Sequence, residues 1–158
     1  MAMPLENSLR INTQEQIKEI PIDFAVESIR IINKIPKLNA EPMYDLTDEN
    51  ISKLEILIDA PFMSFNGIEK YPSLEEKAAA IFCLTIRGHK FGNGNKRTAV
   101  MLLLILLYVN EKWIVLPWTD LYDLAMEIAR TTNAKIDKQI EKVSKILGPV
   151  IIPPINAK

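Results

Sequence analysis

The sequence predicts an all-α protein, a compact helical bundle with one short β-hairpin. Apolar residues recur at helical spacing along most of the chain, and proline, glycine and N-capping residues divide it into helix-length segments. One aromatic-rich segment breaks this pattern and contains an Asn-Gly pair, the strongest short-range signal for a hairpin turn. The 158 residues are 48% hydrophobic and 25% charged, which suits one globular domain with a substantial core. We expect that domain over residues 1–150 and a loose tail over residues 151–158.

Two helices are predicted before the hairpin. The first covers residues 23–35 and ends there because Pro36 has no amide hydrogen and cannot continue a helix. The second follows Thr47, a favourable N-cap, and two acidic residues in its first turn suit the positive end of the helix dipole. Pro61 ends this second helix, and the hairpin then occupies residues 62–71.

Two further helices are predicted directly after the hairpin. Ser73 and Glu76 form a capping box, in which each side chain bonds the backbone amide of the other, and a helix follows to about Arg87. Gly88 is expected to end that helix. The next helix covers residues 96–109 and contains an apolar run that is too short to span a bilayer, so we expect it to be buried on all sides.

Three elements are predicted in the last third of the chain. Residues 113–116 form a short extended piece. Thr119 and Asp120 are expected to cap a helix that ends near Thr132. The last helix covers residues 135–147 and stops at the Gly-Pro pair that follows it.

Composition and charge exclude several functional classes. The formal net charge is −1, from 19 Lys and Arg against 20 Asp and Glu, and no dense basic block occurs, so we expect no nucleic-acid partner. One cysteine, Cys83, and one histidine, His89, cannot form an internal disulfide or a typical zinc centre. A metal would therefore be a hard cation with oxygen ligands. Because the first residues lack the apolar core of a secretory signal, we expect a cytoplasmic protein with no membrane partner.

Residues 88–99 carry the strongest chemical signal of the sequence. Gly92 and Gly94 let the backbone adopt positive φ and approach a ligand closely, and successive amides in such a loop form a concave site for anions. The loop opens into a helix whose free amides favour phosphate. Lys96 and Arg97 lie in the first turn of that helix, where cations oppose the dipole unless a bound anion offsets them. We therefore expect both cations to contact phosphate.

His89 lies at the start of this loop. An imidazole titrates near neutral pH, so His89 is the candidate general base. Taken singly, the glycine-rich loop could be a simple turn, and His89 could be a structural histidine. The convergence of histidine, glycine, asparagine, lysine and arginine within residues 89–97 favours a functional loop.

The run from His89 to Ala99, HKFGNGNKRTA, resembles the signature of the Fic/Doc family, specifically that of its Doc (death-on-curing) branch. The upstream stretches FNG and YPSLEEKAA are similar to the flap of that family and the helix after it. The resemblance covers about residues 61–109. It implies a Fic/Doc-type helical bundle and an enzyme that transfers part of ATP to a Ser, Thr or Tyr hydroxyl of a target protein.

The resemblance also implies roles for the residues of the loop. His89 would deprotonate the attacking hydroxyl, and Phe91 would anchor the loop in the core. The backbone amides at the start of the helix would form an anion hole around the phosphates of ATP, and the cations would neutralise charge in the transition state. The implied phosphate-binding residues are Gly92, Gly94, Asn95, Lys96 and Arg97.

Two features separate this sequence from other patterns of the family. Asn93 stands where the family has Asp or Glu to hold Mg²⁺. An amide oxygen can bind this cation but brings no negative charge, so Asn93 is either a weaker metal ligand or the mark of a catalytically weak binding module. Lys96 and Val100 replace the Gly and Arg of the Fic branch, which transfers AMP, and the Doc branch shares both changes. We therefore expect phosphoryl transfer, with AMP transfer as the alternative.

The resemblance further implies protein partners. A target segment would add a strand to the flap at Asn66 and Gly67, and a plain surface hairpin is the alternative. Lys77 either reaches the active loop or is solvated on its helix. The inhibitory pattern of the family, Ser/Thr-x-x-x-Glu, is absent from the chain. Restraint would then come from a separate antitoxin, as for a toxin that acts on the translation machinery.

Overall fold

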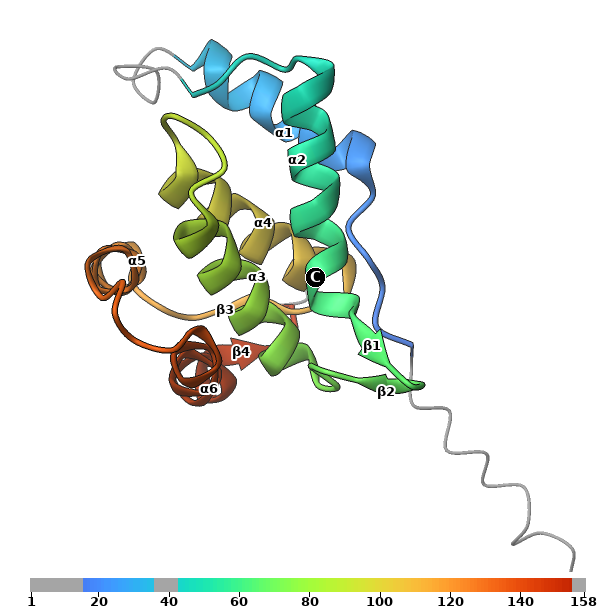
Figure 1. Cartoon of the computed structure of the whole chain (residues 1–158), viewed down its shortest axis with the longest axis vertical. Helices are drawn as coiled ribbons and strands as arrows, with labels where there is room; N and C mark the ends of the chain where they lie inside the picture. The colour runs from blue at the N-terminus through green and yellow to red at the C-terminus, as the bar shows by residue number, and fades with distance from the viewer. Residues whose placement is uncertain (1–15, 36–42, 155–158) are drawn as a thin grey trace, which may run out of the picture.

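The computed structural model describes residues 16–35 and 43–154, and within them the all-α prediction is confirmed (Figure 1). Within these described ranges, six α-helices carry the fold, together with two short 3-10 turns and two small two-stranded antiparallel sheets. The helices are α1 Ile22–Lys34, α2 Asp48–Asp59, α3 Leu74–Gly88, α4 Asn95–Val109, α5 Trp118–Arg130 and α6 Ile136–Leu147. The strands are β1 Ser64–Phe65, β2 Ile68–Glu69, β3 Trp113–Ile114 and β4 Ile151–Ile152, and the 3-10 turns are η2 Ala60–Phe62 and η3 Gly148–Val150.

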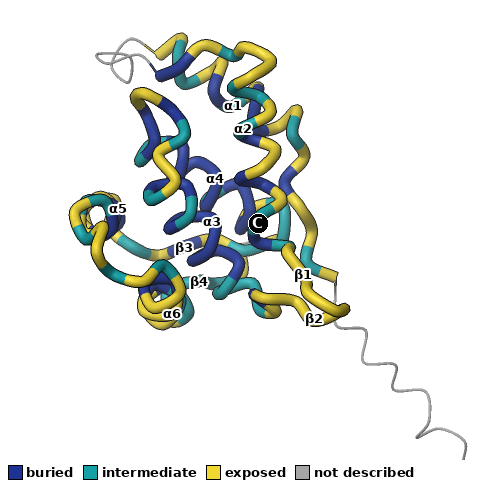
Figure 2. Tube along the Cα trace, in the orientation of Figure 1, coloured by how far each residue is buried: buried dark blue, intermediate teal, exposed yellow. Residues whose placement is uncertain are grey.

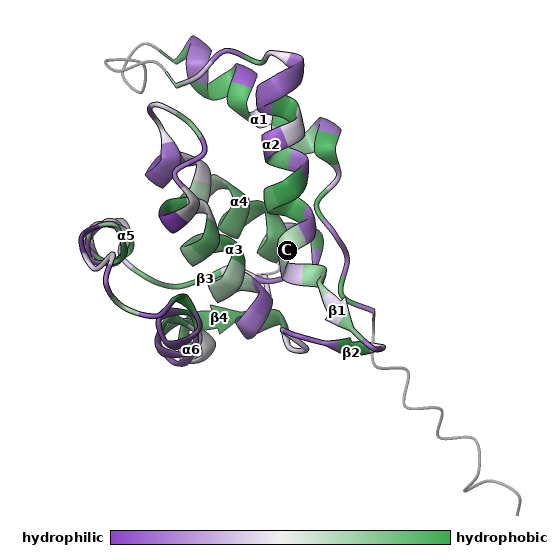
Figure 3. Cartoon of the chain, viewed as in Figure 1, coloured by the Kyte–Doolittle hydropathy of each residue, from purple (hydrophilic) through white to green (hydrophobic). Residues whose placement is uncertain are grey.

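Helices α3 and α4 form the centre of the molecule. Helix α3 packs against α4 on one side and against α6 and α5 on another, and α1 and α2 cover the remaining face. The burial colouring follows this arrangement, with dark blue concentrated on α3 and α4 (Figure 2). Hydrophobic residues run along α4, whereas α6 turns a hydrophilic face outward (Figure 3). No helix in the described part of the chain is long and apolar enough to cross a membrane.

Local signals set the starts of the early helices. The hydroxyl of Thr47 accepts a hydrogen bond from the amide of Asn50 at 3.2 Å, and that of Ser73 accepts one from Glu76 at 3.1 Å. Both predicted N-caps are therefore confirmed. The predicted cap at Thr119 is wrong, because α5 begins one residue earlier and the Pro117 carbonyl accepts its first backbone hydrogen bonds.

The hairpin β1–β2 is confirmed and projects from the start of α3. Asn66 and Gly67 have φ of 52° and 77°, which a tight turn between antiparallel strands requires. Phe65 and Ile68 pair across the strands and are exposed to 79% and 74%. The hairpin therefore offers an apolar tip to solvent.

Lys77 anchors the base of this hairpin. Its side chain is 1% exposed, and the ammonium donates to the carbonyls of Pro61 and Tyr71 and to the Glu69 carboxylate at 3.1 Å. The ammonium also lies 4.8 Å from the centre of the Phe62 ring. Neither predicted role of Lys77 is correct, because the side chain is buried and turned toward the hairpin.

The predicted loose tail is wrong for its first two residues. Ile151 and Ile152 pair with Ile114 and Trp113 in a two-stranded antiparallel sheet, and the amide of Val115 donates to the carbonyl of Val150 at 2.8 Å. This pairing satisfies backbone groups of the extended piece that follows α4. The following two residues have no regular structure, and residues 155–158 lie outside the described part.

Arg87 connects the end of α3 with the turn between α5 and α6. Its guanidinium donates to the carbonyls of Thr132 and Ala134 at 3.0 and 2.9 Å and to the Gln139 side chain at 2.7 Å. These carbonyls lie just past the C-terminal end of α5, where a cation is favourable. The contact holds α5 beside the loop that follows α3.

Candidate active site

The loop between α3 and α4 forms one wall of a pocket of about 310 Å³. That volume lies at the lower end of the range for small-molecule sites. All seven residues that the sequence singled out in this loop line the pocket, and Tyr122 and Ala129 of α5 close it from the other side. The lining residues are Ile86, His89, Gly92, Asn93, Gly94, Asn95, Lys96, Arg97, Tyr122 and Ala129.

His89 ends α3 in a left-handed conformation, with φ 44° and ψ 46°. Gly88 was expected to break the helix, but it is the last helical residue, and the unusual backbone falls on the histidine. A non-glycine residue in this region costs about 1–3 kcal/mol and often marks a functional position. The backbone at His89 turns the chain sharply from α3 into the loop.

Asn95, the first residue of α4, closes the loop with its side chain. Its Oδ1 accepts a hydrogen bond from the amide of Phe91 at 3.1 Å, and its Nδ2 donates to the carbonyl of the same residue at 2.6 Å. Nδ2 also lies 3.1 Å from Nδ1 of His89. Asn95 is 7% exposed, so this clamp is shielded from water and fixes the shape of the loop.

Gly94 is the N-cap of α4, and its conformation requires glycine. Its φ is +84°, and a Cβ atom there would lie 3.1 Å from Cγ of Met43. Its carbonyl accepts from the amide and the hydroxyl of Thr98, both at 2.8 Å. The backbone thus turns into α4 against a tightly packed side chain.

Tyr44 and Phe91 support the loop from the core side. Their rings stack with centroids 3.7 Å apart and planes 8° from parallel, and Phe91 is 2% exposed as an anchor residue should be. The Tyr44 hydroxyl is 3.0 Å from the Thr98 hydroxyl. Burial raises the pKa of Tyr44 to about 12, and the hydrogen bond with Thr98 opposes that shift only in part.

The family model for the Fic/DOC family matches residues 23–107, which include α3, the whole loop and all but the last two residues of α4. The chain belongs to the Fic/DOC family. Neither a search of curated proteins nor a search of solved structures gives a match. Members of the Fic/DOC family are typically transferases that use ATP to modify protein targets.

The electrostatics of this Fic/DOC pocket favour an anion. Lys96 and Arg97 are half-buried in the first turn of α4, and that turn has no acidic residue. The amides at the start of a helix carry a partial positive charge. None of the residues that line the pocket is an aspartate or a glutamate. The arrangement can hold phosphate groups beside His89.

The donor set does not fit a Mg²⁺ ion held by the protein alone. Oδ1 of Asn93 accepts a hydrogen bond from the amide of Gly94 at 2.9 Å. No group of three or more His, Cys, Asp or Glu residues that could hold a metal occurs in the described part of the chain. Mg²⁺ prefers one or two carboxylates together with substrate phosphates, and the pocket offers no carboxylate.

The hairpin predicted to dock a target does not lie at this pocket. Asn66 and Gly67 lie between β1 and β2, before α3, whereas His89 follows α3; Figure 1 shows this hairpin and the loop after α3 at opposite ends of that helix. Helix α3, which lies between them in the chain, has 15 residues and is therefore roughly 20 Å long, at about 1.5 Å per residue. The docking of a target segment at this hairpin stays a prediction.

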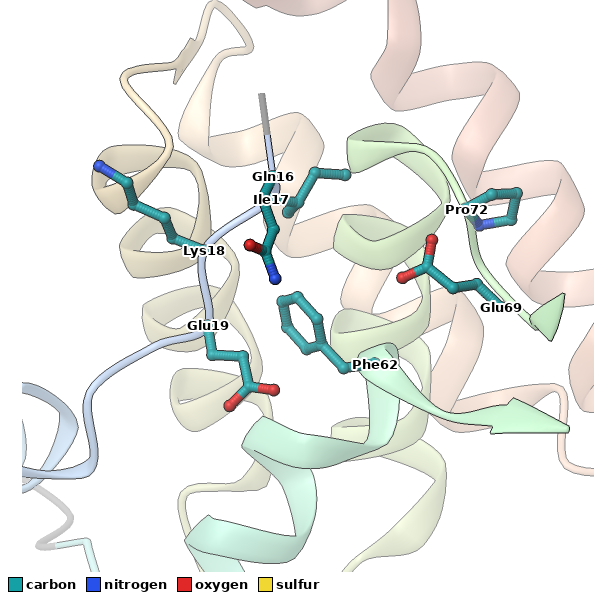
Figure 4. A pocket seen from close by; sticks show the side chains of 7 residues that line it. All are labelled: Gln16, Ile17, Lys18, Glu19, Phe62, Glu69 and Pro72. Carbon is teal, nitrogen blue, oxygen red and sulfur yellow. The ribbon is translucent and has the colours of Figure 1, made fainter. Parts of the chain in front are cut away.

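A larger pocket of about 650 Å³ lies near the hairpin and not at the loop (Figure 4). Phe62 and Gln16 face each other in it, with Glu19 and Glu69 nearby. It contains two carboxylates and no glycine-rich backbone, so it lacks the chemistry of a phosphate site. The smaller pocket beside His89 is therefore the candidate active site.

Proposed function

We propose that this Fic/DOC protein transfers the γ-phosphoryl group of ATP to a hydroxyl of a target protein. The observation that carries the proposal is the convergence of His89, the Gly94 turn and the two cations on one pocket without carboxylates. A base beside a cationic anion hole is the combination that hydroxyl phosphorylation needs.

The proposed step uses each of these groups once. The amides at the start of α4, with Lys96 and Arg97, hold the phosphates of ATP and offset the charge that develops during transfer. His89 takes the proton of the attacking hydroxyl. The hydroxyl oxygen forms a bond to the γ-phosphorus, the bond from that phosphorus to the bridging oxygen breaks, and ADP leaves with the electron pair.

Transfer of AMP is the second candidate. The choice of phosphate rests on Lys96 and Val100, which stand where the Fic branch has Gly and Arg. Purified protein with ATP, Mg²⁺ and a lysate of the source cells separates the two reactions. Label transferred only from the γ-position supports phosphoryl transfer, whereas label transferred from the α-position contradicts it in favour of AMP transfer.

A binding module with little turnover is the third candidate, because Asn93 replaces the usual acid. Asn93→Asp would supply a carboxylate for Mg²⁺. An increase in label transfer upon this substitution supports an enzyme limited at Asn93. No transfer by either form, in folded protein, supports the binding module.

The proposed partners follow from this reaction. The target carries a Ser, Thr or Tyr hydroxyl on a segment that can reach His89, and the translation machinery is the class suggested by the Doc-like signature. A separate antitoxin would restrain the enzyme in the cytoplasm, because the chain lacks the inhibitory Ser/Thr-x-x-x-Glu pattern.

A further inference from the structure

The orientation of the Asn95 amide is fixed by the backbone of Phe91. A backbone N–H can only donate and a backbone carbonyl can only accept. The Phe91 amide contacts Oδ1 of Asn95 at 3.1 Å, and the Phe91 carbonyl contacts Nδ2 at 2.6 Å. Exchange of the two amide atoms would place donor against donor and acceptor against acceptor, so the assignment has one solution.

This orientation of the Asn95 amide places a hydrogen-bond donor, Nδ2, next to the imidazole of His89. One hydrogen of Nδ2 is used by the Phe91 carbonyl, and the second is available to Nδ1 of His89 at 3.1 Å. Nδ1 must therefore accept, and in the neutral ring the proton lies on Nε2. His89 is exposed and lines the pocket, so Nε2 is the ring nitrogen left to the pocket.

We infer that Asn95 is a positioning residue that holds His89 in the Nε2–H tautomer, so that the free pocket presents a hydrogen-bond donor and not a base. In this state Nε2–H adds a donor to the cations and amides that face a bound phosphate. One consequence follows if the proposed function holds, and only this consequence rests on it. Before Nε2 can accept the proton of the attacking hydroxyl, the hydrogen bond between His89 and Asn95 must be broken.

The hydrogen bond between Asn95 and His89 can act as such a restraint because the Asn95 side chain is fixed, whereas the His89 side chain can rotate. Asn95 is buried at the start of α4 and bonded twice to Phe91, whereas the His89 side chain is exposed. Release therefore means rotation of the imidazole and not of the amide. A ring that has rotated away can carry its proton on Nδ1 and accept at Nε2.

Nitrogen NMR of the full chain, labelled with ¹⁵N, tests the inference without any activity assay. His89 is the only histidine, so its two ring nitrogens give signals free of overlap from other imidazoles. At a pH where the ring is neutral, we expect Nδ1 to resonate as an unprotonated nitrogen and Nε2 as a protonated one. A coupling through the hydrogen bond should connect Nδ1 of His89 with Nδ2 of Asn95. A protonated Nδ1 in the parent chain would overturn the inference.

Asn95→Asp provides the matched change. The carboxylate still accepts from the Phe91 amide but can only accept from His89, so the proton should move to Nδ1 and the two nitrogen signals should exchange character. Asn110→Asp makes the same substitution at the other end of α4, where the side chain contacts Lys18 and Leu106, and should leave the ring signals unchanged. An unchanged tautomer in folded Asn95→Asp would overturn the inference, and so would an exchange in Asn110→Asp.

The test remains decisive if Asn95→Asp does not fold. The signal of Nδ1 and its coupling to Nδ2 of Asn95 are both measured in the parent chain, which carries no substitution. Label transfer from ATP is measured separately. Absence of label transfer together with the expected spectrum would refute the proposed function and leave the inference intact. Label transfer together with a protonated Nδ1 would support the proposed function and overturn the inference.

Discussion

Tyr44 lies flat against Phe91, with the two ring centroids 3.7 Å apart. This stack joins the residues before α2 to the middle of the active loop, and the Tyr44 hydroxyl extends the connection to Thr98 in α4. The loop is therefore held by Tyr44, which is distant in sequence, and the same side chain also bonds the helix that follows the loop. Its shape depends on the core as well as on its own glycines.

Tyr44→Phe should separate the two contributions of this side chain. The phenyl ring keeps the stack with Phe91, but the hydrogen bond to Thr98 is lost, so we expect the free energy of unfolding to fall by about 1 kcal/mol. Urea denaturation measures the change. Tyr108→Phe is the control, because Tyr108 is 62% exposed and should show no effect. Equal stability of Tyr44→Phe and the parent would show that the hydroxyl contact is unimportant.

The two glycines of the loop should respond differently to alanine. Gly94→Ala introduces a Cβ at φ +84° and 3.1 Å from Met43, so we expect a loss of about 1–3 kcal/mol in stability. A Cβ at Gly92 meets nothing within 4 Å, and Gly92→Ala should change stability by less than about 0.5 kcal/mol. Denaturation of both variants checks the difference, and the reverse order would refute the account of the turn.

Lys77→Met should loosen the base of the hairpin. The substitution removes a buried ammonium that bonds two carbonyls and Glu69, and we expect a loss of about 1–3 kcal/mol because the carbonyls stay without this partner. Lys70→Met is the matched control: Lys70 pairs with Asp137, and both side chains are largely exposed, so about 0–1 kcal/mol is expected. Thermal unfolding and proteolysis at residues 62–71 measure the effect. Similar losses of stability for both variants would contradict the role of Lys77 at the base of the hairpin.

Stability should fall at alkaline pH because two buried groups resist ionisation. Burial raises the pKa of Cys83 from 9.0 to about 12 and that of Tyr44 from 10.0 to about 12. The unfolded chain loses these protons earlier than the folded chain does. Their contribution is therefore complete below about pH 9 and is lost as the pH rises toward about 12, by about 1.4 kcal/mol per group and pH unit.

Cys83→Ala isolates one of the two groups. The free energy of unfolding of this variant should depend less steeply on pH between pH 9 and pH 11 than that of the parent chain. The reason is that Tyr44 is then the one of these two groups that still has a higher pKa in the folded chain than in the unfolded chain. Urea denaturation at several pH values measures both slopes. Identical slopes would show that burial does not keep the Cys83 thiol protonated.

The sequence predicted features that are encoded locally. The caps at Thr47 and Ser73 and the turn at Asn66 each depend on side chains within a few residues, and all three are confirmed. The loop residues were found for the same reason, because glycine, asparagine and the cations are contiguous there. Fold class followed from helical spacing, which is a property of each segment alone.

Features that depend on tertiary packing were missed or misplaced. Tyr122 lines the pocket from α5, and Arg87 bonds the turn after that helix; no local pattern marks either contact. The tail prediction fails at Ile151 because the strand that it pairs with lies far away in the sequence.

The most direct test of the proposed function compares label transfer from γ-labelled ATP by the parent chain and by His89→Ala. We expect the parent to label a protein in the lysate of the source cells. His89→Ala should reduce that rate by about 100-fold or more, as loss of a general base does, while ATP binding at Lys96 and Arg97 is retained. Transfer at an equal rate by folded His89→Ala would contradict the central claim that His89 takes the proton of the attacking hydroxyl.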